Sequence, residues 1–172
     1  AGARPNQLNR EFPDSWKAGG REVGEGKSWV CPNIPEARKA LLDQWTEDFA
    51  NRAGHDVMRF YAGDPGGCTD ARCTPWGKSF VHLSEEMAAI WHKTHPNSIV
   101  LIANQGLDNE GDRYIFDYLN AQPRTWCYGI CYGPGSNAMS NYFRDKLRDD
   151  LFEYPGDGPV NRYISETLRE LP

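Results

Sequence analysis

Residues 98–103 read SIVLIA, and after the first serine the run is entirely apolar. A strand with one face in water alternates apolar and polar residues, and this stretch does not alternate. It therefore predicts a strand that is covered on both faces, as in a parallel sheet.

Strand and helix patterns alternate on either side of this run. The stretch VMRFYA at residues 57–62 predicts a strand, and an apolar helical face follows from about Ser79 until Pro96 stops it. After residue 103, a helix with Asp108 or Asn109 as its N-cap continues the series. Strand–helix units in series indicate parallel pairing through right-handed crossovers.

The same alternation extends towards both ends of the chain. An amphipathic helix is predicted from Pro35 to near Gly54, a strand at 125–132, and a helix with its apolar residues spaced from Met139 to Leu147. We therefore expect an α/β fold with a parallel sheet of repeated βα units.

One domain is expected over residues 1–172, which is an ordinary length for a single domain. Residues 1–30, rich in glycine, proline and charge, form an irregular N-terminal segment in this prediction, and 155–172 form a C-terminal tail. No signal peptide is visible at the start. The compartment stays open, with an extracytoplasmic or secreted location favoured.

Composition narrows the range of partners. The net charge is −5 and no lysine or arginine run exceeds two residues, so a nucleic-acid partner is not expected. No apolar run reaches the roughly 18–20 residues that cross a bilayer, so no membrane partner is expected either. The five cysteines form an odd set, so at least one thiol is unpaired within the chain.

Ligand chemistry is expected on the loops that leave the strand ends, because ligands of parallel α/β sheets bind there. Asp64 follows the first of these strands between Gly63 and the Pro-Gly-Gly of residues 65–67. It is the leading candidate for a general acid or base, or for a sugar-hydroxyl acceptor. The alternative is that Asp64 caps its own turn.

Other polar residues follow the next strand. Asn104 and Gln105 are predicted to bind ligand hydroxyls or else neighbouring backbone groups. Asp108 and Glu110 are candidates for the second carboxyl group that glycoside hydrolysis requires, and Asp108 is also a candidate helix cap.

A metal site is the less favoured reading of Cys68, Asp70 and Cys73, which lie close together in the sequence. A disulfide or two inert thiols are favoured there, and the same holds for Cys127 and Cys131. The glycine-rich stretch at 133–136 lacks a dinucleotide fingerprint and a phosphate-loop lysine, so no cofactor is expected.

The motifs GDPGGC at 63–68 and PWG at 75–77, with Cys73 and with NQG at 104–106, resemble glycoside-hydrolase-like (β/α)8 barrels of bacterial polysaccharide-degrading systems. The resemblance spans roughly residues 28–154. It implies a TIM-barrel-like fold, as a whole or partial barrel, and carbohydrate binding or hydrolysis. It carries over to Asp64, Asn104, Gln105 and Trp76. Related sequences have a cysteine where Asp70 stands, which lowers the expectation of a metal.

The leading hypothesis is a domain that binds a sugar over Trp76 and Tyr132, with Asp64 as the acidic group. A full barrel takes about 250 residues. Half a barrel would expose a sheet edge, so a homo-oligomer or association with the remainder of a barrel is a possible state. The alternatives are a non-catalytic carbohydrate-binding or assembly module and a flavodoxin-like sheet that binds an anion at residues 133–136.

Overall fold

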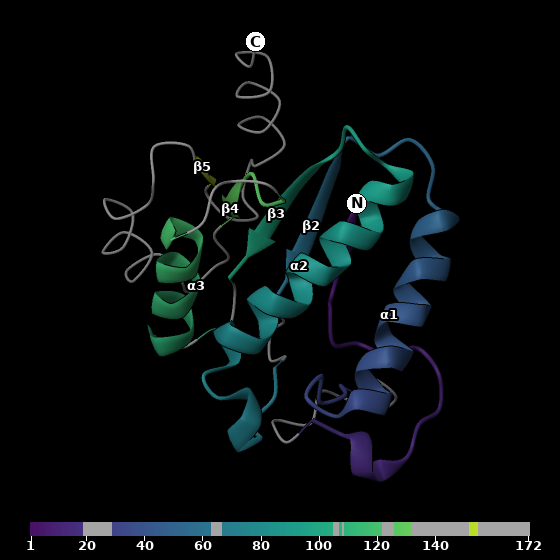
Figure 1. The fold of residues 1–172 in the computed structure, drawn as a ribbon, viewed down its shortest axis with the longest axis vertical. Coiled ribbons are helices and arrows are strands. Elements are labelled where there is room, and N and C mark those ends of the chain that lie inside the picture. The colour runs from purple at the N-terminus through teal and green to yellow at the C-terminus, as the bar shows by residue number, and fades with distance from the viewer. Residues whose placement is uncertain are drawn as a thin grey trace.

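The computed structural model describes most of the first three-quarters of the chain and one short strand beyond it (Figure 1). The described residues are 1–18, 29–62, 67–104, 107, 109–121, 126–131 and 152–154. None of the helices in these ranges has both the length and the apolar composition of a membrane-crossing segment.

The strands form one parallel sheet whose order follows the chain. They are β1 (Gly2–Ala3), β2 (Val57–Tyr61), β3 (Ile99–Ala103), β4 (Gly129–Cys131) and β5 (Phe152–Tyr154). The α/β class and the parallel sheet are therefore confirmed. Within the described residues the sheet is open, because β1 and β5 lie at its two edges. In flavodoxin-like sheets the first strand instead lies between the second and the third, so this order differs from that alternative.

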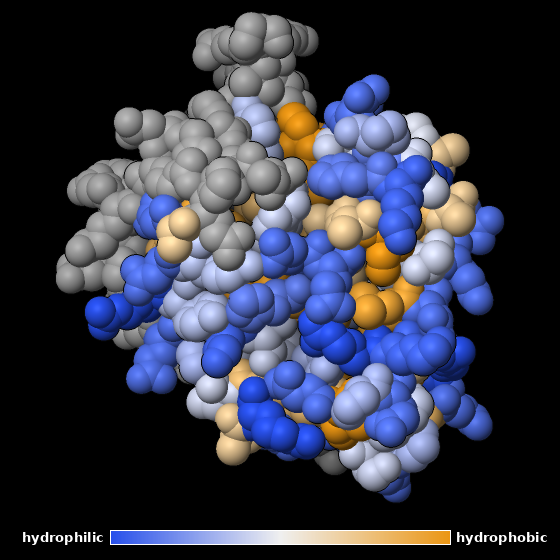
Figure 2. Space-filling view, viewed as in Figure 1, coloured by the Kyte–Doolittle hydropathy of each residue, from blue (hydrophilic) through white to orange (hydrophobic). Residues whose placement is uncertain are grey.

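Three helices cover one face of the sheet. They are α1 (Pro35–Ala50), α2 (Trp76–Thr94) and α3 (Asn109–Ala121). Figure 1 shows them side by side, with α2 packed between the other two. Right-handed crossovers between neighbouring strands place every helix on the same side, which explains this layer. The outward surface of the layer is mainly hydrophilic, with small hydrophobic areas between α1 and α2 (Figure 2).

The main core lies between the helices and the sheet. Alternate strand residues face the helices, and in β2 the buried residues are Met58 and Phe60. The helices contribute large side chains to the same core: Trp45, Phe49, Phe80, Leu83, Met87, Trp91, Ile115 and Phe116. On the opposite face of the sheet a smaller cluster surrounds Leu101 and Ala103. The prediction that β3 is covered on both faces is thus confirmed for its middle and end.

Helices α2 and α3 approach each other closely at two glycines. A Cβ atom added to Gly77 would lie 2.2 Å from the backbone oxygen of Gly111. Two backbones therefore touch directly near the start of both helices. This contact requires glycine at position 77, because any side chain there would force the helices apart.

Most predicted elements occur where the sequence places them, and the differences are at their ends. Helix α2 begins at Trp76 rather than near Ser79, because Trp76 already packs into the core. Strand β4 is shorter than the predicted 125–132. Strand β1 falls inside the segment predicted to be irregular, and its pairing with β2 is a tertiary contact that no local pattern indicates. The helix predicted around Met139 to Leu147 lies outside the described residues.

Two smaller elements belong to the segments that lead into the helices. A short 3-10 helix, η1 (Asp14–Trp16), precedes α1, and another, η2 (Ala71–Cys73), precedes α2. Residues Gln7 and Lys17 form isolated antiparallel bridges with Trp29 and Val30. These bridges hold the N-terminal segment against the stretch that leads to Cys31.

Candidate functional site

The strand ends form a common edge at which a site can be built. Tyr61, Ala103 and Cys131 are register partners at the C-terminal ends of β2, β3 and β4. The segments that follow these strands in the sequence therefore begin next to one another. Some predicted site residues belong to these segments but lie outside the described residues: Asp64, Gln105, Asp108 and Tyr132. The stretch 133–136 also lies outside them.

Trp76 does not offer an open surface for a sugar ring, which corrects the prediction made for it. The side chain is buried, and its indole nitrogen donates a hydrogen bond of 3.0 Å to the backbone oxygen of Ala62. Gly67, with a φ of 115°, lies so close that an added Cβ would be 3.0 Å from the indole ring. Trp76 therefore anchors the connection between β2 and α2.

Asn104 also faces the protein interior. It is 1% exposed, and its amide nitrogen donates a hydrogen bond of 2.9 Å to a carboxylate oxygen of Asp112 in α3. The predicted partners of Asn104 were ligand hydroxyls or backbone groups, and the described contact is instead with the side chain of Asp112. Asp112 is itself buried, and sequence reasoning did not select it.

Glu110 lies in the first turn of α3 and is exposed. Its position suits a helix N-terminus, where a negative charge is favourable. The buried Asp112 lies in the same first turn, two positions further on. Among the three predicted carboxyl groups, Glu110 is the one whose position the structure describes.

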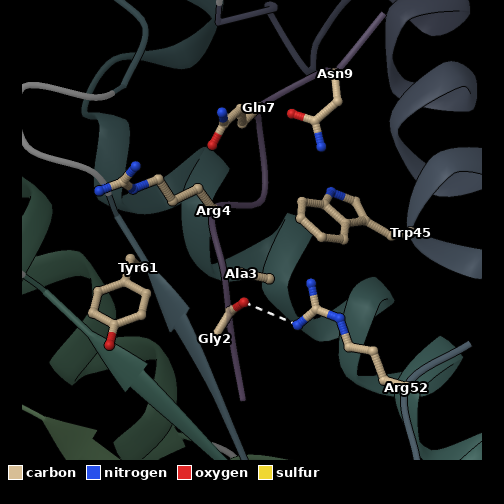
Figure 3. A pocket seen from close by; sticks show the side chains of 8 residues that line it. All are labelled: Gly2, Ala3, Arg4, Gln7, Asn9, Trp45, Arg52 and Tyr61. Carbon is tan, nitrogen blue, oxygen red and sulfur yellow. Dashed lines mark hydrogen bonds between the residues drawn. The ribbon is translucent and has the colours of Figure 1, made fainter. Parts of the chain in front are cut away.

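A pocket with a volume of about 560 Å³ lies around β1, beside the C-terminal ends of β1 and β2 (Figure 3). Tyr61 lies on one side of β1, and Trp45 and Arg52 lie on the other. The Tyr61 ring covers Gly2, since an added Cβ on Gly2 would be 2.9 Å from it. The complete lining is Gly2, Ala3, Arg4, Gln7, Asn9, Trp45, Arg52 and Tyr61.

Polar groups hold the walls of this pocket in place. Arg59 donates a hydrogen bond of 3.0 Å to the hydroxyl oxygen of Tyr61, and its guanidinium lies 5.5 Å from the centre of the ring. On the other wall, Arg52 donates a hydrogen bond of 3.0 Å to the backbone oxygen of Gly2. Arg4 and Asn9 are exposed and Gln7 is half-buried, so their side chains can reach a bound molecule.

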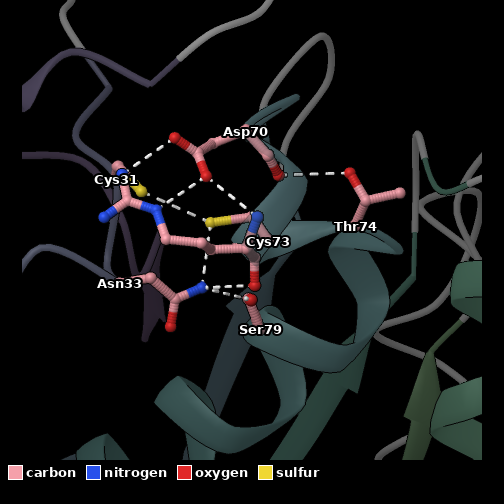
Figure 4. A network of polar contacts seen from close by, with 7 residues as sticks. Cys31, Asn33, Asp70, Cys73, Thr74 and Ser79 are labelled. Carbon is pink, nitrogen blue, oxygen red and sulfur yellow. Dashed lines mark hydrogen bonds and ion pairs between the residues drawn. The ribbon is translucent and has the colours of Figure 1, made fainter.

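Three buried thiols meet at the same edge of the sheet. The sulfur atoms of Cys31, Cys68 and Cys73 all lie within 4.8 Å of one another, and the Sγ atoms of Cys31 and Cys73 are 3.4 Å apart. The three cysteines are free thiols. Asp70 does not join them, which corrects the predicted ligand set. Its carboxylate accepts two hydrogen bonds of 2.8 Å from the Arg72 side chain (Figure 4).

The thiols differ in acidity because they bond to one another. A hydrogen bond from the Cys68 thiol, with further ones from Cys31, Asn33 and Ser79, lowers the pKa of Cys73 to about 6 despite its burial. The same hydrogen bond raises the pKa of Cys68, and burial of the Cys68 thiol is the second cause of this rise. Burial raises the pKa of Cys31. Cys73 is therefore the thiol that most readily becomes a thiolate.

Sequence reasoning missed residues that reach these places from distant segments. Cys31 is separated from Cys73 by 42 positions, and no spacing pattern joins them. Tyr61 could have been found, because strict alternation in β2 places it on the face opposite Phe60. Arg4 and Gln7 belong to a segment without periodicity, so no signal marks them.

The chain was compared with known proteins by sequence. No protein-family model matches it, and no curated protein matches it either. Its likeness to glycoside-hydrolase-like barrels therefore stays a prediction.

Proposed function

We propose that this chain is a glycoside-hydrolase-like domain that binds or hydrolyses a carbohydrate at the C-terminal edge of its sheet. Parallel strands in chain order with helices on one face are the arrangement that a (β/α)8 barrel repeats. In such barrels ligands bind where the strands end. The pocket around β1 lies beside two of these ends.

The lining of this pocket is the observation that carries the proposal. Its volume of about 560 Å³ is within the range of roughly 300–1,000 Å³ that is usual for small-molecule sites. Arg4, Gln7 and Asn9 provide hydrogen-bond donors for hydroxyl groups. The ring of Tyr61, fixed by Arg59, provides a flat apolar surface of the kind on which sugar rings stack.

Hydrolysis would need a carboxyl group from outside this lining, which contains none. Asp64 is three positions beyond Tyr61 in the sequence and is the proposed acid. Asp108 and Glu110 are the proposed sources of the second carboxyl group. Without such a pair the domain would be a carbohydrate-binding module.

Catalysis can be tested by turnover of aryl-glycosides and oligosaccharides. If Asp64 is the general acid or base, Asp64→Asn lowers kcat about 100-fold or more. Asp117→Asn is a matched control, because Asp117 is an exposed aspartate on α3 paired with Arg113. Equal rates for the wild type and Asp64→Asn would contradict the role of Asp64. A glycan that binds without turnover would favour the binding module.

Binding at the pocket can be tested with glycan arrays and calorimetry on two Tyr61 variants. Tyr61→Ala removes the stacking surface, and we expect the affinity for a glycan to fall about 10-fold, the equivalent of about 1.4 kcal/mol. Tyr61→Phe keeps the ring and loses only the hydroxyl group that Arg59 contacts, so its affinity should fall less. Unchanged binding by Tyr61→Ala would remove this pocket from the proposal.

A second candidate function is assembly along β1, the outermost strand on one side of the sheet. Among the described residues, β1 is two residues long and pairs only with β2, and a further strand on its other side would replace the hydrogen bond that Arg52 donates to the backbone oxygen of Gly2. A second copy, or the remainder of a barrel, would then occupy the groove beside β1. Light scattering on the purified chain tests self-association, and a monomer at all concentrations would exclude the homo-oligomer.

A further inference from the structure

Two segments that are far apart in the sequence bring three sulfur atoms together. Cys31 lies just before α1, and Cys68 and Cys73 lie between β2 and α2. In a sheet of βα units the segments that lead into helices gather at the C-terminal edge, which explains why these two meet. No other group of three His, Cys, Asp or Glu residues with this proximity occurs among the described residues.

The spacing of the sulfur atoms suits a tetrahedral metal ion. Zn–S bonds are about 2.3 Å long, so two thiolates on one Zn²⁺ lie about 3.8 Å apart. The observed separations begin at 3.4 Å and do not exceed 4.8 Å, so small side-chain rotations would bring all three to one ion. We propose that Cys31, Cys68 and Cys73 form a binding site for Zn²⁺.

Neighbouring side chains hold the cluster in place. The Asn33 side-chain nitrogen donates hydrogen bonds to the Sγ atom of Cys73, at 3.2 Å, and to the Ser79 hydroxyl, at 3.1 Å (Figure 4). Arg72, next to Cys73 in the sequence, is held by its ion pair with Asp70. Such neighbours orient metal ligands and stabilise their charge.

A disulfide accounts for the cluster less well than a metal does. An S–S bond is about 2.05 Å long and joins two of the three atoms, so one buried thiol would stay without a function. A thiophilic ion uses all three, and Zn²⁺ readily accepts thiolate ligands. The fourth position of the ion is filled by water or by a small ligand, as in sites with three protein ligands.

The ion would stabilise the edge on which the proposed carbohydrate site depends. Cys68 and Cys73 belong to the same β2–α2 connection as Asp64, and Cys31 fixes that connection to the segment before α1. The zinc site itself goes beyond the carbohydrate proposal, and its tests use no glycan.

The direct test measures metal in the reduced, purified full chain. Elemental mass spectrometry should find one Zn²⁺ per chain. When Co²⁺ replaces Zn²⁺, the absorption spectrum should show thiolate-to-cobalt charge-transfer bands with the intensity of three thiolate ligands. These two measurements need no variant, so they hold even if a substitution prevents folding. A chain that binds no zinc, gives no thiolate absorption, or has the mass of one disulfide when isolated with zinc present would overturn the proposal.

Variants then identify the ligands. We expect Cys31→Ser, Cys68→Ser and Cys73→Ser each to lower zinc affinity more than 100-fold, and Asn33→Ala, which removes a supporting contact, about 10- to 100-fold. Cys127→Ser is the matched control, because Cys127 is equally buried and lies outside the cluster. Zinc affinity that falls as far in Cys127→Ser as in Cys73→Ser would also overturn the proposal.

Discussion

The two faces of the sheet differ in what covers them. On the helix face, β2 presents the fully buried Met58 and Phe60 to three amphipathic helices. On the opposite face, the same strand presents the half-buried Val57, Arg59 and Tyr61. The helix face therefore supplies most of the free energy of folding, and the opposite face carries half-buried side chains, of which Tyr61 lines the pocket around β1 together with Trp45 of α1. The two-residue period of a strand thus decides which side chains of β2 form the main core and which one, Tyr61, lines the pocket.

The largest test of this difference replaces two neighbours in β2. Phe60→Ala leaves a cavity in the main core, and we expect it to lower the free energy of unfolding by about 3–5 kcal/mol. Tyr61→Ala affects a half-buried ring on the other face, and we expect a loss of about 1 kcal/mol. Urea unfolding of both variants measures these losses. Equal losses would mean that the two faces contribute alike.

A smaller effect tests how closely the helix layer is packed. Helix propensity alone predicts that Gly77→Ala stabilises the protein by about 1 kcal/mol. The contact with Gly111 predicts instead a loss of about 1–3 kcal/mol, because the new methyl group would meet backbone. Lys93→Ala, at an exposed position near the end of α2, is the control and should change stability by no more than about 0.5 kcal/mol. A stabilised Gly77→Ala protein would show that α2 and α3 are not in backbone contact.

The smallest effect concerns a polar residue within the helix layer. His82 lies in this layer and contacts the Tyr114 hydroxyl at 3.0 Å. Burial lowers the pKa of His82, and the positive charges of Lys78 and Arg38 lower it further, while the negative charges of Glu85 and Glu86 raise it. As the pH falls through about 6.5, His82 is therefore protonated first in the unfolded chain. The free energy of unfolding decreases with falling pH until His82 is protonated in the folded protein as well. Above that pH both states are neutral and the contribution is constant. The free energy of unfolding should differ less between about pH 8 and about pH 5 for His82→Gln than for the wild type, as urea unfolding at both pH values would measure.

Local patterns predicted the central elements well. The apolar run of β3, the alternation in β2 and the four-residue spacing in α1 each arise from the number of sides on which a short segment is covered. Parallel pairing was predicted from the alternation of strands and helices, because a strand–helix–strand unit forms a right-handed crossover between parallel strands. The C-terminal edge was therefore predicted as the place for a site.

Individual site residues were harder to predict, because exposure depends on packing between segments. Trp76 and Asn104 were correctly located beside strand ends in the sequence, yet both side chains turn into the protein. Asp70 was grouped with the cysteines by spacing, but Arg72, two positions away, binds its carboxylate. Sequence proximity does not decide which of several polar partners a side chain meets.

By itself, the sequence determined the alternation of strands and helices, since backbone propensity and hydrophobic period act over a few residues. It also determined the acidic net charge of −5. Only the tertiary structure decided that Cys31 joins Cys68 and Cys73, and that Arg4 and Tyr61 border one pocket. These pairs meet because separate segments are brought to one edge of the sheet, and the free energy of that meeting comes from the whole core rather than from any local pattern.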